Sequence, residues 1–352
     1  MKKSILMILT FGMIFSMAGC GYGQTEALFS ADTDVVPMGE IMELEKGFSA
    51  VRYDGDYGFD KFLSEGGASS DQEVIGFLTE NLLSDTDIGF NGNIFGCSTI
   101  AVQSEDGESL FGRNFDWNHC NAMVVMSYPE NGYASISTVN LDFISQRGLA
   151  GMAMKQDGIK TIAALYAPLD GMNEKGLAVS VNMIQDSATI EQDTEKPDIT
   201  TTTAIRLLLD KAATVDEALE LLDQYDMHAS MGMMVHFAMA DATGKSVAVE
   251  YIGNEMVVTE TPVLTNFYLA EGEKNGIGTE QSHTRYDMLM EQLEENKTMG
   301  MEGVRDALSS VSKGNFGEFE STEWSIVFNQ TSGQAVYYHR ENYEQEYVFT
   351  IE

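Results

Sequence analysis

Cys97 stands at the start of a predicted strand, and a carboxylate follows it on the next strand. The stretch "FGCSTIAVQSEDGESLFGRNFDW" covers residues 95–117. Its Asp106-Gly107 dipeptide lies between two alternating runs, which is a strong hairpin signal. A two-residue loop there places Cys97 opposite Asp116, with Cβ atoms about 4.5–5.5 Å apart on one face. The pattern therefore predicts a carboxylate beside the backbone of the cysteine.

A disulfide is the alternative use of Cys97. Cys97 and Cys120 are the two cysteines that follow Cys20, and exported proteins often pair their cysteines. In the predicted register, Cys120 would lie about 13 Å beyond the partner of Cys97, whereas a disulfide needs Cα atoms within about 7 Å. The chain would have to fold back directly after Trp117. A non-catalytic, ligand-binding lipoprotein with this disulfide stays open as the second interpretation.

The N-terminal residues have the pattern of an export signal. Lys2 and Lys3 precede an apolar run from Ile5 to Met17, which is too short for an ordinary membrane-spanning helix. The sequence Met-Ala-Gly-Cys at 17–20 resembles a bacterial lipobox, with Met where Leu is more typical. We therefore expect a signal peptide at 1–19 and lipidation of Cys20. The predicted location is extracytoplasmic, on the bacterial cell membrane through the lipid anchor, or secreted if cleavage occurs without lipidation.

Charge excludes one class of partner. The chain has 20 Lys and Arg against 55 Asp and Glu, a formal net charge of −35. Such a surface repels nucleic acid and anionic lipid headgroups. The five histidines are dispersed and show no metal-ligand spacing, so we expect no metal and no cofactor. The expected partners are a small-molecule substrate and a membrane reached through the lipid; oligomerisation is left open.

The remaining chain predicts strands and helices in alternating blocks. Residues 21–45 are acidic and mixed, which is typical of a tether, and residues 57–86 have helical periodicity. Strands follow, then a helical block, strands, two helices and a terminal three-strand meander. This order predicts an α+β protein in which helices cover antiparallel sheets. The predicted strands are 98–104, 109–116, 122–127, 134–139, 176–183, 234–240, 246–252, 255–259 and 263–267; the predicted helices after the nucleophile are 202–213, 214–225, 284–296 and 301–311.

Three motifs resemble the linear amide C–N hydrolases of the choloylglycine hydrolase family. The first is Cys97 followed by Gly112-Arg113-Asn114-Phe115-Asp116, with the family's spacing from cysteine to arginine and aspartate. The second is "DGMNEKGLAVSVN" at 170–182, and the third is "VLTNF" at 263–267 followed by "SHTRYDML". The resemblance covers 97–285 in the family's order. The family includes bile salt hydrolases, penicillin V acylases, acid ceramidase and N-acylethanolamine acid amidase.

The resemblance implies an N-terminal nucleophile (Ntn) hydrolase with a four-layer αββα sandwich and an N-terminal helical prosegment. It implies self-cleavage between Gly96 and Cys97, which frees the amine of Cys97 as the base. The domains would be a signal peptide (1–19), a lipid-anchored tether with a helical segment (20–96), and the catalytic domain (97–352). The substrate would be a linear non-peptide amide of the N-acyl amino acid, bile-salt, N-acylethanolamine or penicillin V type, cleaved through a Cys97 thioester.

The resemblance also assigns roles around the thiol. Asp116 would hold the amine, Arg113 would stabilise the thiolate, and Asn266 would donate to the oxyanion. Asn182 matches the second oxyanion donor in kind but comes one residue early, so it could point to the other face of its strand. Arg285 corresponds to the family's later arginine. Strict alternation puts Arg113 and Asp116 on opposite faces, so this reading requires a bulge near residues 112–114 or an arginine that acts from behind the sheet.

Overall fold

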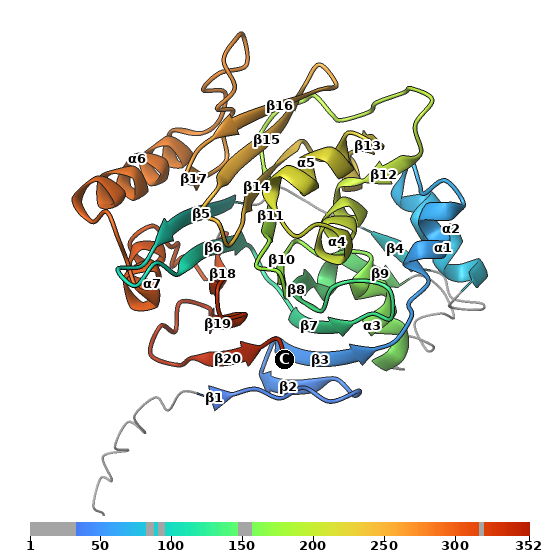
Figure 1. Ribbon diagram of the computed structural model, residues 1–352, viewed down its shortest axis with the longest axis horizontal. Helices are drawn as coiled ribbons and strands as arrows, with labels where there is room; N and C mark the ends of the chain where they lie inside the picture. Colours follow the sequence, from blue (N-terminus) through green and yellow to red (C-terminus); the bar gives the residue numbers. More distant parts are fainter. Residues whose placement is uncertain (1–32, 82–87, 91–95, 147–156, 317–319) are drawn as a thin grey trace, which may run out of the picture.

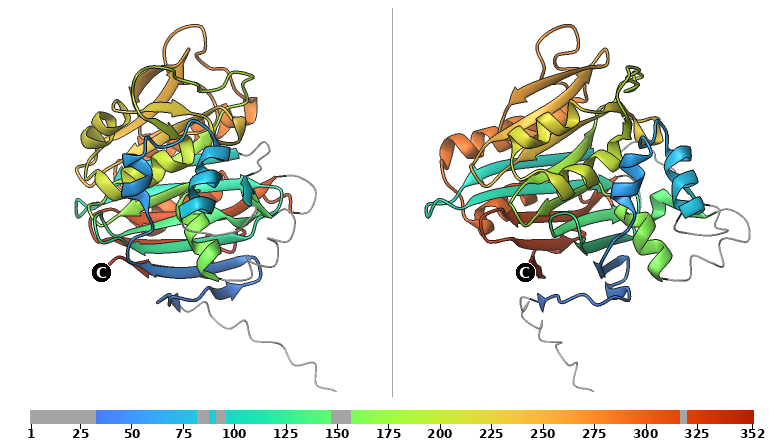
Figure 2. Two further views of the ribbon diagram at one scale, coloured as in Figure 1. Left: turned by 90° about the vertical axis from the view of Figure 1, so that its right-hand side faces the viewer. Right: turned by 45° about the vertical axis from the view of Figure 1, so that its right-hand side comes forward.

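The computed structural model describes residues 33–81, 88–90, 96–146, 157–316 and 320–352. Two large sheets are stacked, and helices cover both outer faces, which gives the four αββα layers expected from the sequence (Figures 1 and 2). The fold class is α+β, as predicted. The predicted signal peptide and Cys20 lie outside the described residues. No helix in the described part of the chain is long and apolar enough to cross a membrane.

The two sheets contain seven and nine of the described strands. The first has the spatial order β1 (Thr33–Asp34), β20 (Tyr347–Thr350), β19 (Gln334–His339), β18 (Ser321–Asn329), β6 (Ser109–Trp117), β5 (Gly96–Gln103) and β17 (Val263–Leu264). The second has the order β16 (Glu255–Glu260), β15 (Ser246–Ile252), β14 (Val235–Ala240), β11 (Ala178–Met183), β10 (Asp170–Asn173), β8 (Ser135–Asn140), β7 (Ala122–Tyr128), β3 (Phe48–Asp54) and β2 (Met42–Glu45).

Helices cover each sheet from outside. On the seven-stranded sheet, α6 (Glu280–Glu295) and α7 (Met301–Ser310) contact β5, β6 and β18. On the nine-stranded sheet, α3 (Asp157–Leu165) contacts β7, and α4 (Thr201–Lys211) contacts β10 and β11. The remaining described elements are α1 (Phe59–Ser64), α2 (Asp71–Asn81), α5 (Val215–Leu222), the 3-10 turns η1 (Leu141–Phe143) and η3 (Ser230–Gly232), and two small sheets formed by β12 (Asp198–Thr200) with β13 (Asp226–His228) and by β4 (Ile88–Phe90) with β9 (Ile144–Gln146).

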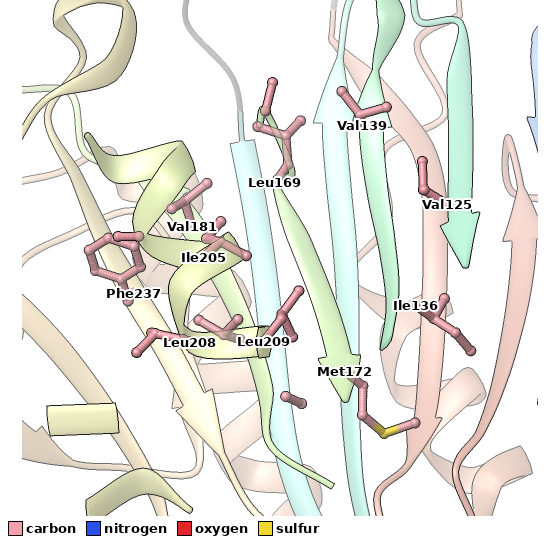
Figure 3. Close-up of a cluster of buried hydrophobic side chains, with 14 of the residues drawn as sticks. Val125, Ile136, Val139, Leu169, Met172, Val181, Ile205, Leu208, Leu209 and Phe237 are labelled. Atoms are coloured by element: carbon pink, nitrogen blue, oxygen red, sulfur yellow. The ribbon is translucent and has the colours of Figure 1, made fainter. Parts of the chain in front are cut away.

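The buried core follows from the spacing of apolar residues. On α4, Ile205, Leu208 and Leu209 recur at helical spacing and face the strands of the nine-stranded sheet (Figure 3). Strand β11 is buried along its whole length, because α4 covers one face and the other sheet covers the second. A second apolar cluster joins α6 and α7 to the outer face of β5 and β6. The strand β5, which begins one residue before Cys97, is therefore packed from both sides.

The register of the β5–β6 hairpin differs from the prediction by one residue. Cys97 pairs with Phe115, and Gly96 pairs with Asp116. The reason is the turn: the backbone N–H of Ser104 donates to the carbonyl of Glu108, and Gly107 has φ +82°. These features belong to a three-residue loop with glycine in the left-handed position, so the two-residue loop assumed from Asp-Gly was wrong. A one-residue slip moves a side chain to the other face of the sheet.

Part of the predicted tether is folded into the sandwich. Strand β1 pairs in parallel with β20, and β2 pairs with β3 at the edge of the nine-stranded sheet. Strand β3 also pairs in parallel with β7 over seven residues. The tether expected to reach residue 45 therefore gives way to strands from residue 33 onward. The expected helical segment at 57–86 contains two separate helices, α1 and α2, over its described residues.

Candidate active site

Cys97 is buried between the two sheets near the start of β5. Its side chain has no solvent exposure. The thiol lies 3.7 Å from the carbonyl of Val181 on β11 and 3.5 Å from Nη2 of Arg113 on β6. Burial raises the pKa of this thiol to about 12, while the nearby guanidinium of Arg113 acts in the opposite direction. In the uncut chain, the thiol is therefore protonated at neutral pH.

Arg113 is held by a buried carboxylate on the facing sheet. Its Nε lies 2.9 Å from Oδ2 of Asp170, and neither side chain is exposed. Trp324 also donates a hydrogen bond to Asp170, at 3.1 Å. Burial raises the pKa of Asp170, and Arg113 opposes that shift. Because Cys97 pairs with Phe115, Arg113 lies on the same face as the thiol, and the pairing is continuous through residues 112–114. The bulge that the sequence reading required is absent there.

Asp116 lies on the opposite face of the hairpin, toward the helices. Its Oδ1 accepts a hydrogen bond of 2.8 Å from the hydroxyl of Thr322. Its Oδ2 accepts no hydrogen bond from a described residue but faces two cations, Lys313 at 3.3 Å and Arg285 at 3.9 Å. The predicted pairing of Asp116 with Cys97 was wrong by one residue, since Asp116 lies opposite Gly96 instead.

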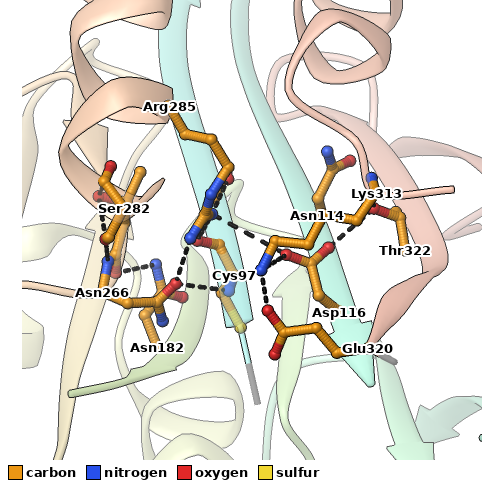
Figure 4. A network of polar contacts seen from close by, with 12 residues as sticks. Cys97, Asn114, Asp116, Asn182, Asn266, Ser282, Arg285, Lys313, Glu320 and Thr322 are labelled. Atoms are coloured by element: carbon orange, nitrogen blue, oxygen red, sulfur yellow. Dashed lines mark hydrogen bonds and ion pairs between the residues drawn. The ribbon is translucent and has the colours of Figure 1, made fainter. Parts of the chain in front are cut away.

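Asn266 and Arg285 bind the backbone of Cys97 (Figure 4). The backbone N–H of Cys97 donates to Oδ1 of Asn266 at 2.8 Å, and Nη1 of Arg285 donates to the Cys97 carbonyl at 2.5 Å. Arg285 also donates to Oδ1 of Asn266, which fixes the orientation of that amide because a guanidinium cannot accept. The backbone N–H of Asn266 donates to the Ser282 hydroxyl, at the start of α6.

Asn182 contacts the segment that precedes Asn266, and its hydrogen bonds to described residues do not include the thiol of Cys97. Its Nδ2 lies 3.3 Å from the carbonyls of both Leu264 and Thr265. The next residue, Met183, accepts a hydrogen bond from Nδ2 of Asn266 at 2.7 Å. In the uncut chain, Asn182 thus supports β17, and the donor group of Asn266 is turned toward Met183. The oxyanion roles expected for both residues stay predictions.

Cys120 is not bonded to Cys97. Both are free, buried cysteines. Burial also raises the pKa of the Cys120 thiol well above its usual value, chiefly by desolvation. The structure thus gives no support to the second interpretation, which depended on a disulfide between these residues.

Known proteins resemble the same part of the chain. Residues 97–267 match the family model described as linear amide C–N hydrolases, choloylglycine hydrolase family. A bile salt hydrolase/transferase of Clostridium perfringens is 27% identical over 180 residues, which is 48% of this chain and 53% of that protein. A penicillin V acylase of Pectobacterium atrosepticum is 27% identical over 169 residues, 44% of each protein. The chain thus spans about half the length of the curated relatives it matches.

Solved structures have the same fold. A conjugated bile acid hydrolase of Clostridium perfringens aligns with a TM-score of 0.55 and 20% identity, over 72% of this chain and 92% of that one. A penicillin V acylase of Agrobacterium tumefaciens aligns with a TM-score of 0.50 and 19% identity, over 69% and 83%. Over residues 97–267, the chain is similar to the choloylglycine hydrolase family of linear amide C–N hydrolases. The fold is the Ntn-hydrolase sandwich of that family.

Some residues of the site lie outside the part that matches the choloylglycine hydrolase family. Arg285 and Lys313 both follow residue 267. Asp170 is the first residue of the "DGMNEKGL" motif, so the sequence pointed to this residue. The sequence did not indicate its contact with Arg113. Nothing in the sequence indicated that Lys313 belongs to the site, because a single lysine after a helix resembles any surface residue. Its side chain is only 5% exposed, and it contacts both Asp116 and Glu320.

Proposed function

We propose that this protein is a self-cleaving hydrolase of linear amide C–N bonds with Cys97 as its nucleophile. The observation that supports this most is the environment of Cys97. Its thiol lies beside Arg113, its own backbone N–H is held by Asn266, and Asp116 lies opposite the preceding residue, Gly96. In such an enzyme, the α-amine of the same residue is the base. A separate histidine is not needed, and the site contacts described above include none.

The uncut chain would be an inactive precursor. While the Gly96–Cys97 bond is intact, the nitrogen of Cys97 is an amide and cannot take a proton. The thiol pKa of about 12 also keeps the nucleophile protonated. Cleavage would convert that nitrogen to an amine with an ordinary pKa near 7.7–8.0. The base would then be joined to the thiol by two carbons and would be partly deprotonated near neutral pH, as a general base should be.

Turnover would then follow in two steps. The amine takes the proton of the Cys97 thiol, and the sulfur attacks the substrate carbonyl to form a tetrahedral oxyanion. The C–N bond breaks, the amine of Cys97 gives its proton to the leaving nitrogen, and a thioester remains. Water, deprotonated by the same amine, attacks the thioester and releases the acid. Arg113 stabilises the thiolate, and amide groups such as those of Asn266 and Asn182 would donate to the oxyanion once the cut chain rearranges.

The substrate class is proposed from the relatives' names. The names of two similar proteins mention bile salts and penicillin V. Both are acyl amides. N-acyl amino acids and N-acylethanolamines contain the same bond and belong to the same proposal. We further propose export and lipid attachment at Cys20, supported by the lipobox-like sequence at 17–20. Membrane fractionation tests this: the Cys20→Ala protein should become soluble, and its persistence in the membrane would contradict lipid anchoring.

The central test combines intact mass with a substrate panel. Active protein should contain two chains that separate at Gly96–Cys97, and it should hydrolyse at least one acyl amide of the panel. Cys97→Ala should be uncut and inactive. Full activity in an uncut chain would show that Cys97 is not an N-terminal nucleophile. A cut protein that hydrolyses none of the panel would limit the proposal to self-cleavage.

A further inference from the structure

Lys313 lies so close to the scissile residue Gly96 that a side chain at this position would displace it. A Cβ added to Gly96 would lie 2.7 Å from Nζ of Lys313, 2.8 Å from Oδ2 of Asp116 and 3.1 Å from Oε1 of Glu320. Distances under 3.0 Å are closer than real Cβ atoms show. Because residue 96 has no side chain, the ammonium of Lys313 and the carboxylate of Asp116, both buried, can lie directly against Gly96. The Gly96–Cys97 bond is the one that is cut under the proposed function.

The surrounding charges form a compact set in which Glu320, 27% exposed, is the most accessible member (Figure 4). Lys313 pairs with both Asp116 and Glu320, and its side chain is 5% exposed. Arg285, from α6, faces Asp116 from the other direction at 3.9 Å. The Lys313 backbone N–H donates to the Thr322 hydroxyl, which in turn donates to Asp116. Lys313 is therefore held in place by its backbone and by its charge together.

Self-cleavage creates two new charges at this place. The Cys97 sulfur attacks the Gly96 carbonyl carbon, the C–N bond breaks, and the nitrogen takes protons to become an ammonium. Water then attacks the thioester, the C–S bond breaks, the thiol recovers its proton, and Gly96 ends as a carboxylate. The net reaction is peptide plus water to carboxylate plus ammonium. Both ions appear in a buried region, where an unpaired charge is strongly disfavoured.

We propose, resting on the proposed function, that Lys313 and Asp116 are a preformed pair of counter-ions that exchange partners when the chain is cut. Lys313 binds the new carboxylate of Gly96, and Asp116 binds the new ammonium of Cys97. Each new ion then has an opposite charge already in place. Lys313 is a positioning residue for self-cleavage, and Glu320 keeps its ammonium balanced before and after the cut.

The test compares Lys313→Met with wild type and with Lys313→Arg. Self-cleavage of freshly folded protein is followed by intact mass, in water and with added hydroxylamine. In water, we expect Lys313→Met to cleave about 100-fold more slowly, since removing one member of a buried pair is costly. Lys313→Arg should keep most of the rate because it keeps the charge. Lys196→Met, at an exposed lysine that pairs with Asp223 at 3.3 Å, is the matched control and should cleave like wild type.

Hydroxylamine separates the charge role from a structural one. It resolves the thioester to a hydroxamate at Gly96, which is uncharged near neutral pH and needs no counter-ion. Hydroxylamine should therefore restore cleavage of Lys313→Met to near the wild-type rate, with the hydroxamate visible by mass. Wild-type cleavage rates in water for Lys313→Met would overturn the inference, as would a defect that hydroxylamine leaves unchanged. A wild-type chain that never cleaves would instead overturn the proposed function.

Discussion

The buried pair of Arg113 and Asp170 should set the reactivity of Cys97 with opposite signs. Arg113 lies 3.5 Å from the thiol and favours the thiolate, whereas Asp170 disfavours it. At 3.5 Å and an effective dielectric constant of about 20, full opposite charges attract by roughly 4–5 kcal/mol. Because the guanidinium charge is spread and Asp170 offsets part of it, we take roughly 1.5–3 kcal/mol as the net effect, which is about 10- to 100-fold in thiolate population.

The perturbations are Arg113→Met, Asp170→Asn and the two combined. Arg113→Met should lower the rate of Cys97 alkylation by iodoacetamide about 10- to 100-fold at fixed pH, and Asp170→Asn should raise it. Each single change leaves a buried partner unpaired, so each should cost roughly 3–5 kcal/mol of folding free energy. The double variant removes both charges and should recover much of that stability, yet its thiol should stay slower than that of wild type, because Arg113 has the larger effect of the two on the thiol pKa.

The assay follows alkylation of cut protein by intact mass across pH, with the free energy of unfolding measured in parallel by urea. All variants are made in a Cys120→Ser background, so that alkylation of the piece that begins at residue 97 measures Cys97. We expect Cys120→Ser alone to affect activity little. If Arg113→Met alkylates at the wild-type rate, or if the double variant recovers reactivity together with stability, then Arg113 acts through the fold and the electrostatic reasoning is refuted.

Three other predictions follow from the same structure. Asp116→Asn should keep the fold through the Thr322 hydrogen bond but lose most amide hydrolysis, because the amine loses its charged acceptor; near-normal turnover would contradict this. Burial raises the pKa of Glu323 to about 7, so the folded protein loses stability as pH rises from about 4.5 to 7. Glu323→Gln should therefore match wild type in urea unfolding near pH 4.5 and exceed it by up to about 3 kcal/mol at pH 8; an equal gain at both would refute the assignment. After cleavage, the piece ending at Gly96 should co-elute with residues 97–352 in native gel filtration, because β3 lies between β2 and β7; separation without denaturant would contradict this.

Local sequence patterns predicted most of the sandwich but could not supply contacts between distant segments. The strand predicted at 234–240 matches β14 (Val235–Ala240), and the helix predicted at 202–213 matches α4 (Thr201–Lys211). The segment at 48–54 was missed because its partner, β7, begins near residue 122 and pairs in parallel. Parallel pairing leaves no turn signal between the two strands.

The one-residue error in the hairpin explains why the sequence named residues that lie around Cys97 but put Asp116 and Arg113 on the wrong faces. With Gly96 opposite Asp116, the Cys97 thiol and Arg113 face the layer between the sheets, whereas Asp116 faces the helices. The thiol of Cys97 and the nitrogen that cleavage would free thus lie beside different layers of the fold. Changes on the sheet side, at Arg113, should act on the thiol, whereas changes on the helix side, at Lys313, should act on the new amine and carboxylate. A cysteine at the start of a buried strand could serve both layers if the chain is cut there as we propose, because the cut would free its nitrogen while the thiol faces the layer between the sheets.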